Sequence, residues 1–153
     1  MSVSLLSTKI HIPHLRPNSI SRPRLTERLL AGPKRPGSFV LLSGPAGFGK
    51  TTLLSEFVVE YQRPVAWVSL DKADNDPIRF WTYLSTACQS IQHDIGESAL
   101  ALLQTPQRLP DETIPTILIN DIHSSDTDFV LVLDDFHTIH YCIHYFGSVA
   151  PLR

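Results

Sequence analysis

The sequence predicts one α/β domain built around a parallel sheet. Three short apolar runs, at 38–42, 65–70 and 129–133, are typical of buried strands, and segments of helical periodicity separate them. Strands that alternate with helices usually pair in parallel, because the intervening helix returns the chain to the same edge of the sheet. A length of 153 residues corresponds to one ordinary domain.

Composition excludes several protein classes. Hydrophobic residues make up 42% and charged residues 18%, a balance typical of a folded domain rather than a disordered chain. The formal net charge of −2 gives no overall basic field for nucleic acid. Cys88 and Cys142 have neither metal-site spacing nor the number needed for a disulfide framework. No apolar run is long enough for a signal peptide or a membrane span, so we expect a cytoplasmic protein without a membrane partner.

The N-terminal part predicts an arm, a short helix and a strand. Residues 1–23 contain three prolines and no clear period, so we expect an extended arm. Leu25, Leu29 and Leu30 recur at helical spacing and predict a short helix that ends before Gly32-Pro33. The apolar run 38–42 then predicts a buried strand directly before a glycine-rich turn.

The central part predicts a helix, a strand and three further helices. From Lys50 onward, apolar residues lie on one helical face, and they are Leu53, Leu54, Phe57, Val58 and Tyr61. Residues 65–70 predict a second strand. Asp76 and Pro77 are a typical cap and first residue of a helix, whose predicted buried stripe is Phe80, Leu84, Cys88 and Ile91. Residues 95–104 and 114–123 predict two short helices, the second with Leu118, Ile119 and Ile122 inward.

Residues 44–51 match the phosphate-binding pattern G-x-x-x-x-G-K-[ST], also called Walker A, at every required position. Glycines allow several backbone N–H groups to face one anion, and the following helix adds the positive end of its dipole. Lys50 is expected to reach the β- and γ-phosphates, and the Thr51 hydroxyl to ligate Mg²⁺. The predicted binding residues are Gly44, Pro45, Ala46, Gly47, Phe48, Gly49, Lys50, Thr51 and Thr52.

A pair of acidic residues follows the last predicted strand. Asp134 and Asp135 come directly after residues 129–133, and the carboxyl ends of parallel strands lie beside the ligand site in such folds. We expect Asp134 to hold Mg²⁺ and Asp135 to orient or deprotonate the attacking water, with Lys50 as the second catalytic residue. The alternative is a strand that ends in two solvated acids.

Taken in order, several segments resemble the N-terminal ATPase domain of MalT-like, LuxR-type transcriptional regulators, within the STAND group of P-loop NTPases. They are 5–10, 21–25, 41–52, 65–71, 74–77 with 79–81, and 131–137. The resemblance implies a three-layer P-loop fold in which ATP or ADP binds with Mg²⁺ and Arg22 or Arg24 approaches the nucleotide. It leaves open the role of Asp71. It also implies a switch that self-associates and binds DNA through a C-terminal domain.

The resemblance also implies that this chain is an N-terminal fragment. The family's later strands, its arginine sensor and its DNA-binding end would be absent, so we expect very slow hydrolysis. The expected organisation is an arm at 1–23, a partial P-loop NTPase domain at 24–139 and a divergent tail at 140–153. Two alternatives remain open: a self-contained small P-loop enzyme such as a kinase, and a non-functional truncated product.

Three other groups of residues do not indicate a separate functional site. His137, His140 and His144, with Cys142, do not match a recognised zinc spacing. The basic residues between 16 and 35 lack interleaved aromatic residues, which favours a solvated face or help in phosphate binding over nucleic-acid recognition. Trp67, Phe80, Trp81 and Tyr83 are expected in the core.

Overall fold

The computed structural model describes residues 5–32, 38, 40–107 and 110–140. These residues form two compact units. The first, called here the sheet unit, contains residues 5–11 and the described residues from 64 to 140. The second, called the loop unit, contains the described residues from 12 to 63.

The sheet unit is built on two parallel strands, β1 (Val65–Ser69) and β2 (Val130–Asp134). Val65 pairs with Val130 and Ser69 with Asp134, so both strands end at the same edge. β1 is buried along its centre, where Ala66, Trp67 and Val68 are at most 1% exposed. The parallel sheet expected from the apolar runs is therefore confirmed for these two strands.

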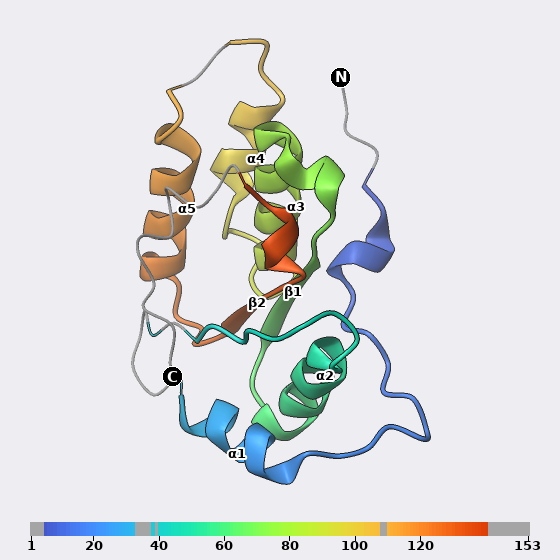
Figure 1. The fold of residues 1–153 in the computed structure, drawn as a ribbon. Coiled ribbons are helices and arrows are strands. Elements are labelled where there is room, and N and C mark those ends of the chain that lie inside the picture. Colours follow the sequence, from blue (N-terminus) through green and yellow to red (C-terminus); the bar gives the residue numbers. More distant parts are fainter. Residues whose placement is uncertain (1–4, 33–37, 39, 108–109, 141–153) are drawn as a thin grey trace. The chain divides into compact units, whose positions relative to one another are not determined.

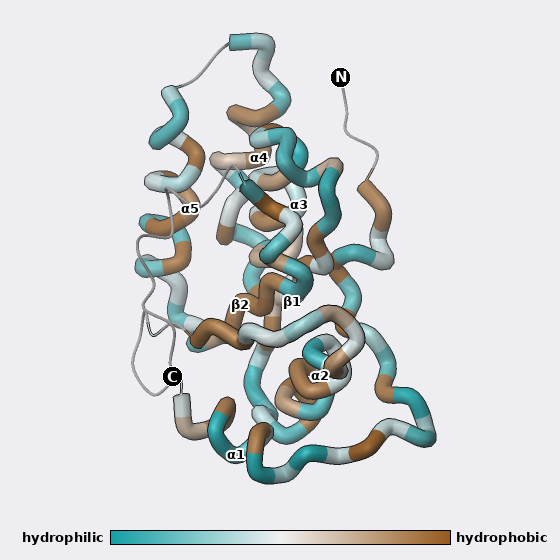
Figure 2. The backbone as a smooth tube through the Cα atoms, in the orientation of Figure 1, coloured by the Kyte–Doolittle hydropathy of each residue, from teal (hydrophilic) through white to brown (hydrophobic). Residues whose placement is uncertain are grey.

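Three helices complete the core of the sheet unit. α3 (Pro77–Gln89) packs on β1 and on α4 (Glu97–Leu103), and α4 packs on α5 (Thr113–Ser124) (Figure 1). The tube in Figure 2 is brown through β2 and alternates between brown and teal along α5, as expected for a buried strand and an amphipathic helix. The predicted core aromatics Trp67, Phe80, Trp81 and Tyr83 are all buried.

Two sequence predictions for the sheet unit were wrong in detail. The arm is not extended throughout, because Ser7–Ile10 form a 3₁₀ helix, η1, that contacts β1 and α3. In α5, Leu118 is buried but Ile119 is 64% exposed rather than inward. Successive residues on a helix differ by about 100°, and the buried face is set by Ile114 and Leu118, four residues apart.

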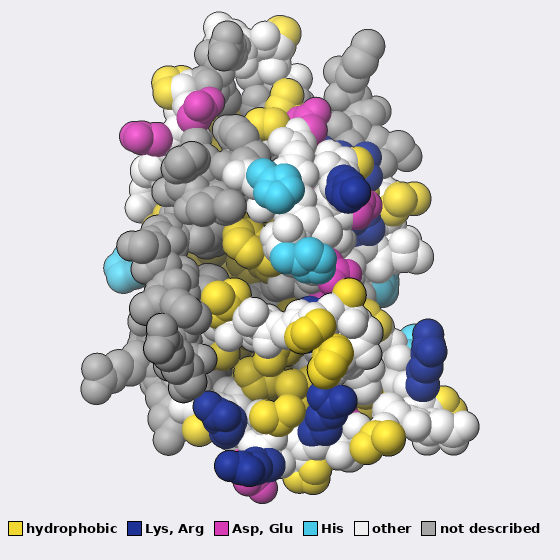
Figure 3. All heavy atoms as spheres, viewed as in Figure 1, with side chains coloured by type: hydrophobic (Ala, Val, Ile, Leu, Met, Phe, Trp, Pro, Cys, Tyr) yellow, Lys and Arg dark blue, Asp and Glu magenta, His cyan; other side chains and the backbone are white. Residues whose placement is uncertain are grey.

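The loop unit contains two helices, α1 (Pro23–Ala31) and α2 (Lys50–Tyr61), which pack against each other. Both helices were predicted. The buried side chains of α2 include Leu53 and Phe57, in agreement with the predicted face, whereas Leu54, Val58 and Tyr61 are half-buried. Lys and Arg side chains gather over α1 on the face shown in Figure 3. Arg24 and Arg28 on this helix are exposed, as the interpretation of a solvated basic face requires.

The predicted strand at 38–42 is not formed. Ser38 and residues 40–43 have neither helical nor strand structure, and the described residues contain only the two-stranded sheet β1–β2. A strand requires hydrogen bonds to a neighbouring strand, so an apolar run without such a neighbour stays irregular. The predicted burial is not observed either, because Val40 and Leu42 are half-buried and Leu41 is 38% exposed. The apolar pattern contained no information about a pairing partner.

Candidate functional site

The glycine-rich loop runs into α2 through two residues in the left-handed region. Gly47 has φ 82° and Gly49, the N-cap of α2, has φ 75°. Residues with a Cβ rarely adopt these angles, which explains the two glycines. Phe48 N–H donates to the Pro45 carbonyl at 3.4 Å, and residues 44–48 are exposed. The loop thus presents backbone N–H groups at a helix N-terminus, where an anion is stabilised.

Lys50 is the first residue of α2, and its ammonium group lies over the loop. The Nζ atom donates to the Gly44 carbonyl at 2.8 Å and to the Pro45 carbonyl at 2.9 Å. Thr51 follows in the first turn, and its carbonyl accepts from Ser55 Oγ at 2.9 Å. A bound phosphate would compete with the two loop carbonyls for the Lys50 ammonium, because a doubly charged oxygen cluster is the stronger acceptor.

Arg22 lies beside the loop. Its guanidinium donates to the Phe48 carbonyl at 3.0 Å, and its backbone N–H donates to Glu56 Oε2 at 3.4 Å. The structure therefore brings this predicted residue next to the phosphate-binding segment. Arg24, predicted together with it, lies exposed in the first turn of α1 and does not line the pocket described next.

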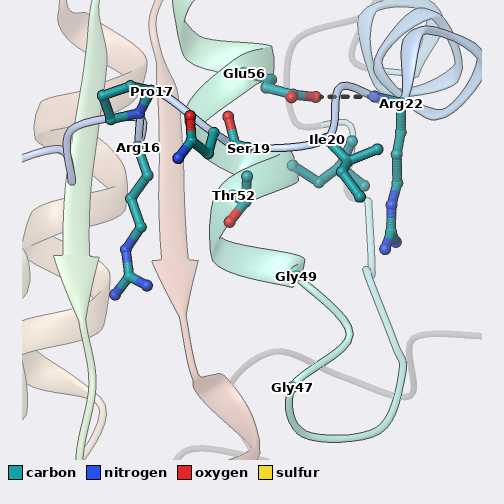
Figure 4. Close-up of a pocket in the computed structure, with 11 residues that line it drawn as sticks. Arg16, Pro17, Ser19, Ile20, Arg22, Gly47, Gly49, Thr52 and Glu56 are labelled. Carbon is teal, nitrogen blue, oxygen red and sulfur yellow. Dashed lines mark hydrogen bonds between the residues drawn. The ribbon is translucent and has the colours of Figure 1, made fainter.

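A pocket of about 660 Å³ lies between the arm segment 16–22 and the start of α2 (Figure 4). Its lining is Arg16, Pro17, Asn18, Ser19, Ile20, Arg22, Gly47, Gly49, Thr52, Leu53 and Glu56. The arm bends at Pro17-Asn18, where Ser19 N–H donates to the Arg16 carbonyl at 3.0 Å. The volume is within the range of small-molecule sites. The sequence analysis did not predict Arg16–Ile20 or Glu56 as lining residues. The Pro17-Asn18 pair indicates a turn, but it does not indicate which helix the turn packs against.

Asp134 and Asp135 end β2 in the sheet unit. Asp134 is 3% exposed, and its Oδ1 accepts the backbone N–H of Asp135 at 3.0 Å. Asp135 is exposed, has φ 57°, and lies 3.9 Å from Nδ1 of His137. The predicted loop residues and Arg22 thus lie in the loop unit, and the two acidic residues lie in the sheet unit.

Asp71 takes part in a network of hydrogen bonds and ion pairs within the sheet unit. It caps a 3₁₀ helix, η2 (Lys72–Asn75), through its hydrogen bond from Ala73 N–H at 2.8 Å. Lys9 Nζ donates to Asp71 at 2.9 Å and also pairs with the fully buried Asp74. The hydrogen bond from Lys9 is the main cause that holds the pKa of the Asp71 carboxyl below its ordinary value of 3.8. Arg79 Nε completes the cluster at 2.9 Å from Asp74.

The histidines considered for metal binding fall partly outside the described residues. Cys142 and His144 lie there, as does nearly all of the tail at 140–153. His140 donates its backbone N–H to Asn75 Oδ1 at 2.7 Å. Within the described part of the chain, potential ligand atoms gather in one other exposed group, made by His93, Asp94 and Glu97. No helix in the described residues has the length and apolar character of a membrane span.

Comparisons with known proteins agree with this geometry. The family model of the AAA ATPase domain matches residues 22–141. The serine/threonine-protein kinase PknK of Mycobacterium tuberculosis is 32% identical over 123 residues, which covers 78% of this chain and 11% of the kinase. The HTH-type transcriptional regulator MalT of Vibrio cholerae is 30% identical over 135 residues, covering 88% of this chain and 15% of the regulator.

A third relative extends the same pattern. MalT of Yersinia enterocolitica is 32% identical over 135 residues, again 88% of this chain and 15% of the regulator. The chain therefore spans between 11% and 15% of the length of these relatives. The resemblance to the ATPase domain of MalT-like regulators is confirmed, together with the α/β fold class. The chain belongs to the AAA ATPase domain family.

Proposed function

We propose that this chain binds ATP with Mg²⁺ and serves as the nucleotide-binding switch module of a longer MalT-like regulator. The observation that carries the proposal is the loop at the start of α2, where Gly47 and Gly49 hold left-handed angles and Lys50 and Thr51 follow directly. Phosphate oxygens, backbone N–H groups and a lysine ammonium are complementary in charge and hydrogen bonding.

The similarity to two kinds of relative supports a shared nucleotide-binding role. One relative is named a protein kinase and the others are named transcriptional regulators, yet most of this chain matches both kinds. A segment common to proteins with such different names is best explained by an activity that both need. Nucleotide binding by an AAA ATPase domain is such an activity.

Each predicted residue has a role in the proposal. Residues 44–52 hold the phosphates, with Lys50 as the point charge on the β- and γ-phosphates and Thr51 as a Mg²⁺ ligand. Asp134 holds Mg²⁺ and Asp135 positions the attacking water. The guanidinium of Arg22, beside the loop at the Phe48 carbonyl, stabilises phosphate charge, and Arg24 serves as a second cation.

The wider context is also a proposal. The resemblance supports a cytoplasmic protein in which residues 1–23 are an arm, residues 24–139 the nucleotide domain and residues 140–153 a separate tail. DNA binding and self-association belong to other parts of the regulator. From the same resemblance we expect slow hydrolysis, at or below the rate of a GTPase without its arginine finger.

Titration calorimetry of the whole chain with Mg-ATP tests the proposal. We expect Lys50→Ala to weaken binding by about 10- to 100-fold, because it removes charge-assisted hydrogen bonds to the phosphates. Lys72→Ala is the matched control, since Lys72 is exposed on η2 in the sheet unit and should not change affinity. Equal affinity of the wild type and Lys50→Ala, or no binding by the wild type, would contradict the proposal.

A further inference from the structure

Glu56 is a buried carboxylate in the loop unit, and no described residue provides a cationic partner for it. It lies on α2, is 8% exposed and lines the pocket beside the phosphate-binding loop. Its Oε2 accepts from the Arg22 backbone N–H at 3.4 Å and from Thr26 Oγ1 at 3.5 Å. Among the described residues no Lys, Arg or His forms an ion pair with it. A buried charge with two long hydrogen bonds retains strong acceptor capacity.

Its second oxygen, Oε1, has no hydrogen bond among the described residues. Both hydrogen bonds of the carboxylate go to Oε2, and both are longer than the usual range for such bonds. A carboxylate can accept about four hydrogen bonds. Figure 4 shows Glu56 and Thr52 projecting from the same helix among the arm residues of the pocket, with the dashed contact to Arg22.

The position of Glu56 along α2 corresponds to the sugar of a bound nucleotide. Lys50 begins the helix, and a rise of 1.5 Å per residue places Glu56 about 9 Å further along the axis. Thr52 lies one turn before Glu56 on the same face, and both line the pocket. A nucleotide that binds its phosphates at the helix N-terminus and fills this pocket would therefore place its ribose near the carboxylate.

The chemistry of the pocket supports the same assignment. Ribose hydroxyls are donors, and a carboxylate is the acceptor that binds them most strongly. Pro17, Ile20 and Leu53 supply apolar lining on which a base can lie. We propose that Glu56 accepts hydrogen bonds from the ribose hydroxyls and thereby makes the site select ribonucleoside over deoxyribonucleoside triphosphates. This inference rests on the proposed nucleotide binding.

The test compares ATP with 2′-deoxy-ATP and 3′-deoxy-ATP by calorimetry, with Mg²⁺ and the whole chain. The wild type should bind ATP about 10-fold more tightly than at least one deoxy analogue, as expected for a hydrogen bond to a charged group. Glu56→Gln keeps an oxygen for Arg22 and Thr26, and the preference should fall to about 3-fold or less because the acceptor is neutral. Glu60→Gln, exposed one turn later on α2, should keep the full preference.

Three results would overturn the inference while leaving nucleotide binding intact. They are equal affinity of the wild type for ATP and both deoxy analogues, an unchanged preference in Glu56→Gln, and a wild-type preference for ATP over inosine triphosphate that Glu56→Gln removes. The last would mean that the carboxylate contacts the 6-amino group of the base instead. Failure of the wild type to bind any nucleotide would overturn the proposed function as well. A thermal melt of Glu56→Gln that matches the wild type excludes misfolding as the cause of a reduced preference.

Discussion

Lys9 and Asp74 form an ion pair inside the sheet unit although 65 positions separate them in the chain. Asp74 is fully buried and also binds Arg79, while the Lys9 side chain is 9% exposed and lies 4.7 Å from the centre of the Tyr83 ring. The Tyr83 hydroxyl in turn accepts the Leu6 backbone N–H at 3.0 Å. The segment around η1 is thus fastened to η2 and α3 by charge and by hydrogen bonding.

Replacement of Lys9 should destabilise the sheet unit strongly. Lys9→Met keeps most of the side-chain volume but removes one of the two cations paired with Asp74 and leaves Arg79 as the other. Removal of one partner of a buried pair costs about 3 kcal/mol. Urea denaturation followed by tryptophan fluorescence measures the loss. Lys72→Met, on exposed surface, should change the free energy of unfolding by less than about 0.5 kcal/mol. A loss below about 1 kcal/mol for Lys9→Met would show that the pair contributes little.

Stability should depend on acid pH through Asp71. Its pKa is lowered in the folded state, so its contribution is complete above 3.8 and is lost as pH falls through the lower folded value. The difference in unfolding free energy between the wild type and Asp71→Asn should therefore be largest above pH 3.8 and shrink toward more acidic pH. If the difference in unfolding free energy between the wild type and Asp71→Asn stays constant as the pH falls, the lowered pKa of Asp71 is contradicted.

The loop conformation predicts that alanine substitutions at its glycines lower Mg-ATP affinity to different degrees. Gly49→Ala places a Cβ at φ 75°, and a non-glycine residue held in this region costs about 1–3 kcal/mol. We expect Mg-ATP affinity to fall by about 10-fold or more, because the loop relaxes away from the binding conformation. Gly44 lies outside the left-handed region, and an added Cβ there meets no atom within 4 Å. Gly44→Ala should therefore lose less affinity than Gly49→Ala; the reverse order would be inconsistent with this loop geometry.

Cys88 should be unreactive in the folded protein. It lies on α3 with no exposed surface, and burial raises the pKa of its thiol to about 12. The thiolate is the reactive form, so iodoacetamide at pH 8 should modify Cys88 only after denaturant is added. The variant Cys142→Ser removes the second cysteine and makes the readout specific. Rapid alkylation of this variant without denaturant would show that α3 opens locally.

The parts of the structure that were predicted correctly depend on neighbours in sequence. Asp76 caps α3 as expected, with Oδ1 accepting from Ile78 N–H at 2.8 Å, because a cap and its helix are adjacent in the chain. The phosphate-binding loop was recognisable for the same reason. The run at 38–42 failed as a strand because pairing is decided by residues far away, and a local apolar pattern does not contain that information.

In the candidate site, too, features set by neighbours in sequence were predictable and features set by distant residues were not. Lys50 and the two glycines could be identified from spacing alone, whereas the pocket depends on the turn at Pro17-Asn18 folding onto α2. Glu56 was hidden because an acid within a helix is usually solvated, and only its burial and lack of a cation distinguish it. Nothing in the sequence pattern around Lys9 or Asp74 indicates that these two residues form an ion pair.

The order of the two units along the chain has a consequence for folding during synthesis. Residues 5–11 belong to the sheet unit but are separated from its remainder by the whole loop unit, which occupies the positions from 12 to 63. Lys9 is therefore synthesised long before Asp74, and the partners of Lys9 exist only after α1 and α2 have been synthesised. Closing such a long segment is slow relative to forming a local helix. The loop unit can thus collapse first, and the N-terminal segment docks last, as a late step that completes the sheet unit.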